Sequence, residues 1–246
     1  TTVAGERITN YGSQKFATSP VSTVAEEFSS GEMLIPDALS TRSHKSTISL
    51  TGNIEDRVSA YGGRWADTAA ITSVTLTQNS LAFAIGSTFE LCVVDESFNI
   101  DEEILGSNGT ITVSSISGAD GDIVQIGNLR STRDLNRDLF QIDLNGDTTN
   151  TNYAHTEINA SDTSVNTSGP TATRYVGWLP GNQGDEGAFG AYVGQFINYS
   201  YGSNDRTMLA FSGGVSEVAE ASGCQLRLYS TRWNNTAAIT SIKLSP

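Results

Sequence analysis

Residues 64–77 read Arg-Trp-Ala-Asp-Thr-Ala-Ala-Ile-Thr-Ser-Val-Thr-Leu-Thr, and residues 232–245 read Arg-Trp-Asn-Asn-Thr-Ala-Ala-Ile-Thr-Ser-Ile-Lys-Leu-Ser. Nine of the 14 positions are identical, and two further positions carry conservative exchanges. Chance does not produce a match of this length, and an internal repeat constrains the fold more strongly than any local pattern. The sequence therefore predicts two copies of one structural unit.

Shorter matches extend the repeat towards the N-terminus of each copy. The offset between matched residues changes from block to block, as expected for related strands that are joined by loops of different length. We therefore predict two modules, residues 1–97 and residues 98–246. The matched blocks are Thr47–Gly52 with Met208–Gly213, Gly31–Leu34 with Gly194–Ile197, and Thr9–Tyr11 with Thr151–Tyr153.

Each predicted copy lacks a segment that the other contains. Nothing in the first copy corresponds to residues 111–147, and nothing in the second corresponds to residues 83–94. The first module is thus expected to be N-terminally incomplete, and the second to lack its closing strand. Three interpretations stay open. The chain is a window from a longer tandem array, or the two copies complete each other, or a neighbouring chain supplies a strand, since an unpaired sheet edge accepts one.

The composition is typical of an all-β protein. Charged residues make up only 17% of the chain, and no long segment places apolar residues at helical spacing. Apolar and polar residues instead alternate over short segments, as in strands with one buried face. We predict an all-β fold with two related antiparallel β-sandwich modules of jelly-roll type. Strands are expected at residues 33–35, 47–50, 74–76, 89–94, 111–113, 124–126, 140–144, 192–197, 208–211, 224–228 and 240–244.

The formal net charge of -13 argues against a nucleic-acid partner, because binding to phosphates needs clustered Lys and Arg. Anionic membrane surfaces are disfavoured for the same reason, and no apolar run is long enough for a transmembrane helix. Cys92 and Cys224 lie in alternating apolar segments and are expected to be buried free thiols. A disulfide between them is the alternative.

The sequence carries no catalytic motif. His44 and His155 are the only histidines, and neither belongs to a metal-binding or nucleophile motif. Asp143, Asn145 and Asp147 occupy alternate positions like the first ligands of a calcium loop, but the glycine and the glutamate of that loop are misplaced. Their segment contains Asn-Gly, so a hairpin turn is favoured over a calcium site. We predict a protein that is not an enzyme and has no cofactor.

The aromatic residues offer two different interpretations. Trp65 and Trp233 begin equivalent strands, so they are expected to fill the same core position in each copy rather than to stack on sugars. The repeated core motif comprises Arg64, Trp65 and Ile71 in the first copy and Arg232, Trp233 and Ile239 in the second. Both arginines are expected to pair with nearby Asp or with the partner strand. A surface for a glycan or a protein partner is predicted instead at Trp178, Tyr192, Tyr199 and Tyr201.

Three segments together resemble a known module. They are Ile-Ser-Gly-Ala-Asp-Gly-Asp-Ile-Val-Gln-Ile-Gly-Asn-Leu-Arg-Ser at residues 116–131, Leu-Asn-Gly-Asp-Thr at 144–148 followed by Asn-Tyr at 152–153, and the Arg-Trp segment at 232–242. In this order they resemble β-rich structural proteins of tailed bacteriophage virions, which occur as minor structural, tail or decoration components.

The resemblance implies a structural component of the virion, either capsid-decorating or tail-associated. Its expected partners are neighbouring virion proteins and copies of itself, and its expected location is the extracellular particle. The alternative is a receptor- or carbohydrate-binding β-sandwich module of a tail fibre or a secreted surface protein, with glycans as partners.

Overall fold

The computed structural model describes residues 30–52, 58–77, 87–91, 108–116, 122–161, 164–196, 199, 205–215 and 224–246. Within these ranges the fold is all-β, as predicted, with thirteen strands in three antiparallel sheets. The only helical element there is the single 3-10 turn Asn150–Asn152.

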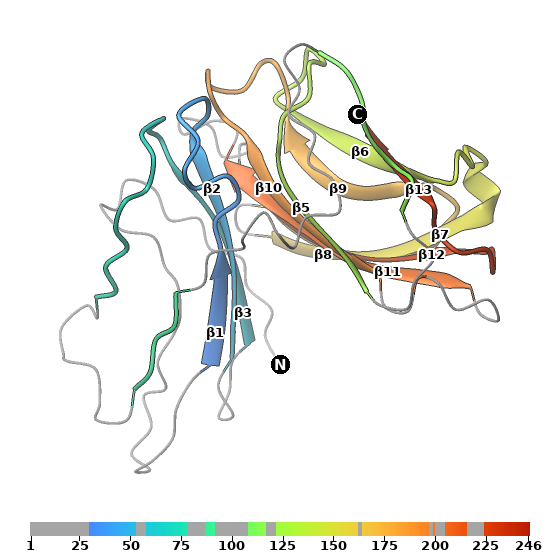
Figure 1. Cartoon of the computed structure of the whole chain (residues 1–246), viewed down its shortest axis with the longest axis horizontal. Coiled ribbons are helices and arrows are strands. Elements are labelled where there is room, and N and C mark those ends of the chain that lie inside the picture. Colours follow the sequence, from blue (N-terminus) through green and yellow to red (C-terminus); the bar gives the residue numbers. More distant parts are fainter. Residues whose placement is uncertain are drawn as a thin grey trace.

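Two of the sheets form a sandwich (Figure 1). The six-stranded sheet has the order β5 (Ile123–Leu129), β10 (Gly190–Phe196), β11 (Arg206–Val215), β12 (Cys224–Trp233), β7 (Tyr153–Ser161) and β8 (Ser164–Thr171). The four-stranded sheet has the order β4 (Ile111–Ser114), β13 (Ser241–Ser245), β6 (Arg137–Leu144) and β9 (Tyr175–Pro180). Side chains alternate between the two faces of a strand, so every second residue enters the core between the sheets. Fully buried core residues include Phe140, Ile142, Tyr192, Met208, Tyr229 and Trp233.

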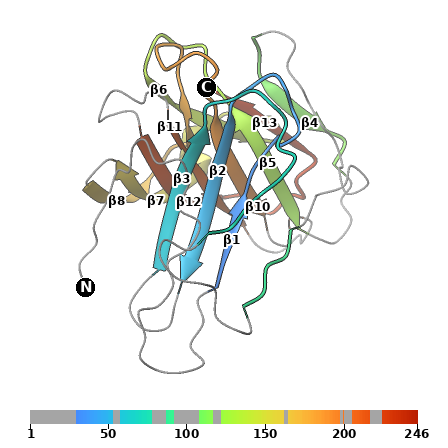
Figure 2. The same ribbon diagram turned by 90° about the vertical axis from the view of Figure 1, so that its left-hand side faces the viewer.

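The third sheet lies on the opposite face of the six-stranded sheet. It consists of β1 (Ser30–Leu34), β2 (Lys45–Gly52) and β3 (Val58–Trp65), in that order. Figure 2 shows it in front of the six-stranded sheet. Ile48 of β2 packs against Ala191 and Phe211, with the partly buried Leu226 and Leu228 beside them. The described strands of residues 1–97 therefore form one three-stranded sheet, and the predicted boundary at residue 97 lies outside the described residues.

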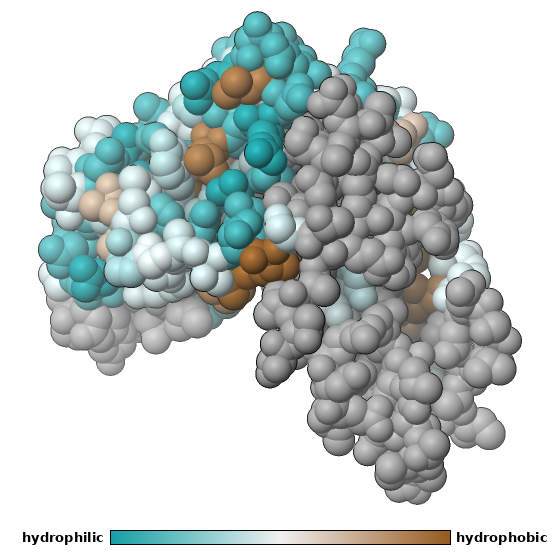
Figure 3. Space-filling model, turned by 180° about the vertical axis from the view of Figure 1, so that it is seen from behind, coloured by the Kyte–Doolittle hydropathy of each residue, from teal (hydrophilic) through white to brown (hydrophobic). Residues whose placement is uncertain are grey.

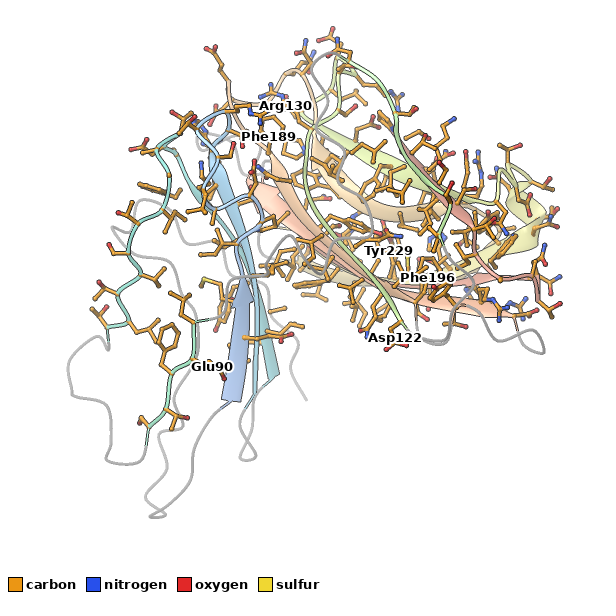
Figure 4. The ribbon with its side chains drawn as sticks, in the orientation of Figure 1. Glu90, Asp122, Arg130, Phe189, Phe196 and Tyr229 are labelled. Carbon is orange, nitrogen blue, oxygen red and sulfur yellow. The ribbon has the colours of Figure 1, made fainter. Side chains whose placement is uncertain are left out.

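Polar contacts join this layer to the sandwich at one end of the molecule. Arg64 forms an ion pair with Asp185 at 2.6 Å, and the Asn128 amide donates to Ser43 Oγ at 2.9 Å. The Ser46 Oγ–H donates to the carbonyl of Phe189 in the sandwich. Arg130 lies at the same end of the molecule as Phe189 (Figure 4), and its guanidinium donates to backbone carbonyls of residues 182–188.

The two copies share the register of one strand pair. Lys45 lies opposite Trp65 in the β2–β3 pair, and Arg206 lies opposite Trp233 in the β11–β12 pair. Lys45 and Arg206 are both buried cations, and each donates to a backbone carbonyl in the loop that follows its tryptophan partner. This correspondence supports the proposal that one unit was duplicated.

Two predicted strands of the first copy are wrong where the structure describes them. Residues 74–76 and 89–91 are in neither a strand nor a helix, and residues 92–94 lie outside the described part. The equivalent of residues 74–76 in the second copy is β13, which is held between β4 and β6. The described part of the first copy places no pair of strands beside residues 74–76. A strand there would leave its backbone N–H and C=O groups without hydrogen-bond partners.

Candidate functional site

The Asn-Gly segment forms the tight turn that the sequence predicts. Asn145 has φ 53° and Gly146 has φ 74°, and the Asp147 N–H donates to the Leu144 carbonyl at 2.9 Å. Two consecutive positive φ angles are the signature of the type I′ hairpin turn, which Asn-Gly adopts at low steric cost. The turn follows β6 directly.

The three candidate calcium ligands point to different partners. Asp143 pairs with Arg174, and Lys243 lies at 4.0 Å from the same carboxylate. Asn145 Oδ1 accepts from the Thr240 and Ser241 N–H groups, while its amide donates to the Ala238 carbonyl. Asp147 accepts from other side chains. Within the described residues no group of three acidic, His or Cys side chains could hold a metal ion.

Asp147 instead anchors a buried tryptophan. Its Oδ2 accepts from Trp233 Nε1 at 2.8 Å and from the Asn152 amide at 2.9 Å. Tyr153 stacks on the Trp233 ring with centroids 6.4 Å apart, accepts from the Leu144 N–H and donates to the Asp147 carbonyl. These contacts tie the turn after β6 to the end of β12, so the repeated tryptophan is structural in the second copy.

These hydrogen bonds alter the acidity of Asp147. Burial acts to raise its pKa, but hydrogen bonds from Trp233, Asn152 and Thr149 outweigh burial and lower the pKa below the ordinary value of 3.8. Because the pKa of Asp147 is lower in the folded state than in the unfolded state, its ionised carboxylate stabilises the fold. This stabilisation is fully present at pH values above the unfolded-state pKa, and it is lost as the pH falls through the folded-state pKa.

We therefore expect Asp147→Asn to destabilise the protein at neutral pH but much less in acid. The loss should be on the order of 1 kcal/mol near neutrality, because a partly exposed charged hydrogen bond is screened by solvent. Urea unfolding of the variant and the wild type at about pH 6 and about pH 3 measures this difference. The same difference at both pH values would contradict the role of the Asp147 charge.

The repeated residues are buried unequally. Trp233 is 2% exposed and Ile239 is fully buried, as the core prediction requires, but Trp65 is 41% exposed. The prediction of a core role for Trp65 is wrong because β3 is an edge strand among the described residues. Trp233 lies opposite Tyr153 of the neighbouring strand β7. Among the described residues no strand pairs with the outer edge of β3, so Trp65 has no cross-strand aromatic neighbour on that side. Ile71 is partly buried, and its N–H donates to the Ala38 carbonyl.

Both repeated arginines pair with Asp, as predicted, but to different extents. The Arg64 side chain is largely buried and lies 2.6 Å from Asp185. Arg232 is exposed and lies 3.8 Å from Asp205, a separation at which a surface pair contributes little.

The predicted aromatic surface is wrong where the structure describes it. Trp178, Tyr192 and Tyr199 are all buried, so their rings are not displayed to solvent. Tyr192 lies in the core, where its hydroxyl donates to Gln125 Oε1 and burial raises its pKa. Tyr201 lies outside the described residues, as do Cys92 and the side chain of Cys224. The free-thiol prediction therefore stays a prediction.

The exposed feature of the sandwich is strand β5, at the border of the six-stranded sheet (Figure 2). Its sequence, Ile-Val-Gln-Ile-Gly-Asn-Leu, has neither charge nor proline. Sheet edges are normally protected by shortness, by charged residues or by proline. Among the described strands, most of the other edge strands have such a device: β1 is short and contains Glu32, β4 is short, β8 contains Pro170, and β9 ends at Pro180.

An apolar row crosses the outer face of the six-stranded sheet and ends on β5. Cross-strand pairing aligns Ile126, Val193, Phe211, Leu228 and Ile158 on five neighbouring strands. The three-stranded sheet covers the middle of this row, at Phe211, but the two ends stay open. Ile126 is 45% exposed and Ile158 is 48% exposed, and Val124 adds exposed apolar area beside Ile126 on β5. We call strand β5, with its exposed Val124 and Ile126 side chains, the β5 face.

Exposed apolar side chains also occur outside the β5 face, at Leu39, Phe89 and Leu91. The rear view in Figure 3 shows a described surface that is mainly hydrophilic, with separate small apolar groups. None of the helical structure in the described residues is long and apolar enough to cross a membrane. No protein-family model, curated protein or solved structure matches this chain.

Proposed function

We propose that this protein is a structural, non-catalytic component of a bacteriophage virion, capsid-decorating or tail-associated, that binds neighbouring subunits. The observation that carries the proposal is the β5 face, an unprotected sheet edge flanked by exposed apolar side chains. The family resemblance of residues 116–131, which include β5, points to the same role.

The occupant of the β5 face is a second copy of this chain. Asp122 precedes β5 and Arg130 follows it, at opposite ends of the strand (Figure 4). Two β5 strands paired antiparallel about Ile126 bring Asp122 of each chain level with Arg130 of the other, whose charged guanidinium keeps its hydrogen bonds to carbonyls of its own chain. In-register parallel pairing would instead bring like charges to the same level. Antiparallel self-pairing is therefore electrostatically complementary.

Such pairing joins two sandwiches into one continuous sheet. Backbone hydrogen bonds satisfy the edge of β5, and the exposed Val124 and Ile126 side chains of both chains come together on one face. The net charge of -13 on each chain opposes the association. Added salt screens this repulsion, so dimerisation should strengthen as ionic strength rises.

Sedimentation velocity at about 0.05 M and about 0.5 M NaCl tests this expectation, since the Debye length falls several-fold over that range. We expect a larger dimer fraction at high salt, and we expect Ile126→Lys to abolish the dimer. The matched control is Ile158→Lys, which places the same charge at an equally exposed position of the apolar row, on the internal strand β7. A monomeric wild type at high salt, or equal effects of the two variants, would rule out pairing through β5.

The particle assignment needs a separate measurement. Gold-labelled antibodies against the protein should bind tailed bacteriophage particles at regular positions. Electron microscopy of particles purified from the material that contains this sequence shows the labelling. Labelling of free protein only would contradict the virion role even if the dimer forms.

A further inference from the structure

The chain contains two Asn-Gly pairs, Asn108-Gly109 and Asn145-Gly146. In such a pair the backbone nitrogen of glycine can attack the amide carbon of the preceding asparagine, because glycine has no Cβ to shield that nitrogen. The two pairs are chemically identical but lie in different surroundings. A comparison between them therefore isolates what the fold does to this reaction.

The amide of Asn145 is held on both sides. Its Oδ1 accepts from the N–H groups of Thr240 at 2.7 Å and Ser241 at 3.1 Å, and its Nδ2 donates to the Ala238 carbonyl at 2.8 Å. The positive φ angles of Asn145 and Gly146 also fix the backbone of the pair in its tight turn. An attack by the Gly146 nitrogen requires these hydrogen bonds to break and the turn to open.

The pair Asn108-Gly109 lies on the surface without such restraints. Asn108, Gly109 and Thr110 are all exposed and belong to neither a strand nor a helix, and β4 begins only at Ile111. Exposed connecting segments of this kind change their backbone angles more readily than paired strands. The Gly109 nitrogen can thus reach the Asn108 amide carbon through local rotations alone.

We infer that Asn108 is a site of spontaneous covalent modification, and that the fold protects Asn145 from the same reaction. The Gly109 nitrogen loses its proton to solvent base and forms a bond to Asn108 Cγ. The Cγ–Nδ2 bond breaks, and ammonia leaves with a proton from water. A second water molecule then opens the five-membered imide at either carbonyl, which leaves aspartate or isoaspartate in place of Asn108.

The modification changes the surface just before β4. It replaces a neutral amide with a carboxylate, so it adds one negative charge to a chain whose net charge is -13. The isoaspartate product also routes the backbone through the former side chain. Within the described residues β4 is an edge strand that pairs with β13 alone, so this change lies at a border of the sandwich. The inference is independent of the proposed virion role.

Mass spectrometry of a tryptic digest measures both sites in one sample, because Arg130 and Arg137 place them on different peptides. The folded protein is kept at mildly alkaline pH, and a parallel sample is unfolded in guanidinium chloride. In the folded protein Asn108 should react at least roughly tenfold faster than Asn145, since several hydrogen bonds must break at Asn145 first. In the unfolded protein the two rates should become similar.

Gly109→Ala tests the proposed attacking atom. Gly146 and Gly187 are the described glycines with a positive φ, so the backbone at Gly109 accepts alanine. The added Cβ shields the nitrogen, and the modification of Asn108 should slow several-fold. The matched control Gly169→Ala alters another exposed glycine, which does not follow an asparagine, and should leave the rate unchanged.

Three results would overturn the inference. Equal rates at Asn108 and Asn145 in the folded protein would mean that the fold protects neither or both. A difference that persists in guanidinium chloride would assign the effect to the neighbouring sequence instead of the fold. An unchanged rate at Asn108 in Gly109→Ala would exclude the cyclic route.

Discussion

Replacing Trp233 with alanine is expected to lower the free energy of unfolding by about 3–5 kcal/mol, the usual cost of removing a buried Trp side chain. Trp65→Ala, the same substitution at the matching position of the repeat, should cost less than about 1 kcal/mol, as at most surface sites. The difference follows from burial, since Trp233 is 2% exposed and Trp65 is 41% exposed.

Urea unfolding followed by circular dichroism measures both values. Trp233→Phe should fall between the two alanine variants, because it keeps most of the ring contact with Tyr153 but loses the hydrogen bond to Asp147 and part of the buried ring. Equal losses for Trp233→Ala and Trp65→Ala would mean that the two tryptophans have the same environment, against the arrangement described here.

A second large effect is expected at Gly181, directly after β9. An added Cβ would lie 2.0 Å from the carbonyl oxygen of Leu135 and 3.2 Å from that of Arg133. Both contacts involve backbone, which cannot rotate away. Three backbone hydrogen bonds also hold residues 181–183 to residues 133–136. Gly181→Ala must push these two segments apart, and we expect a loss of about 3 kcal/mol, at the upper end of overpacking substitutions.

Gly169→Ala in β8 is the matched control, because an added Cβ there meets no atom within 4 Å. We expect it to be neutral or to stabilise the protein by up to about 1 kcal/mol, since alanine restricts the unfolded chain. Thermal unfolding of both variants measures the difference. If Gly181→Ala unfolds at the wild-type temperature, residues 133–136 are not fixed against residues 181–183.

The sequence predicted the strands whose residues alternate on one buried face. β6 and β13 are clear examples, because each has a regular pattern and a turn signal at its boundary. β3 was missed because Gly62 and Gly63 interrupt its pattern, and β8 because its residues are almost all polar. β9 was missed because five of its six residues are buried, so its two faces do not differ.

The sequence was less informative about which aromatic residues are buried. Trp65 and Trp233 have nearly the same local sequence, but only Trp233 has Tyr153 on the neighbouring strand. Trp178 lies in a segment rich in Gly and Tyr, which resembles a surface, yet its ring packs near Gly214 of β11. Burial in these cases depends on strands distant in sequence, which a local pattern does not contain.

The contact between the three-stranded sheet and the sandwich has a mechanical consequence. The apolar part of that contact is a small cluster around Ile48 and Phe211, and its polar part includes the Arg64–Asp185 pair at one end. The sandwich core, by contrast, extends across both of its sheets. Among the described residues this apolar contact is much smaller than the sandwich core, so we expect a force applied between the layers to separate the three-stranded sheet before the sandwich deforms. Such a separation would uncover the whole apolar row while leaving the sandwich intact.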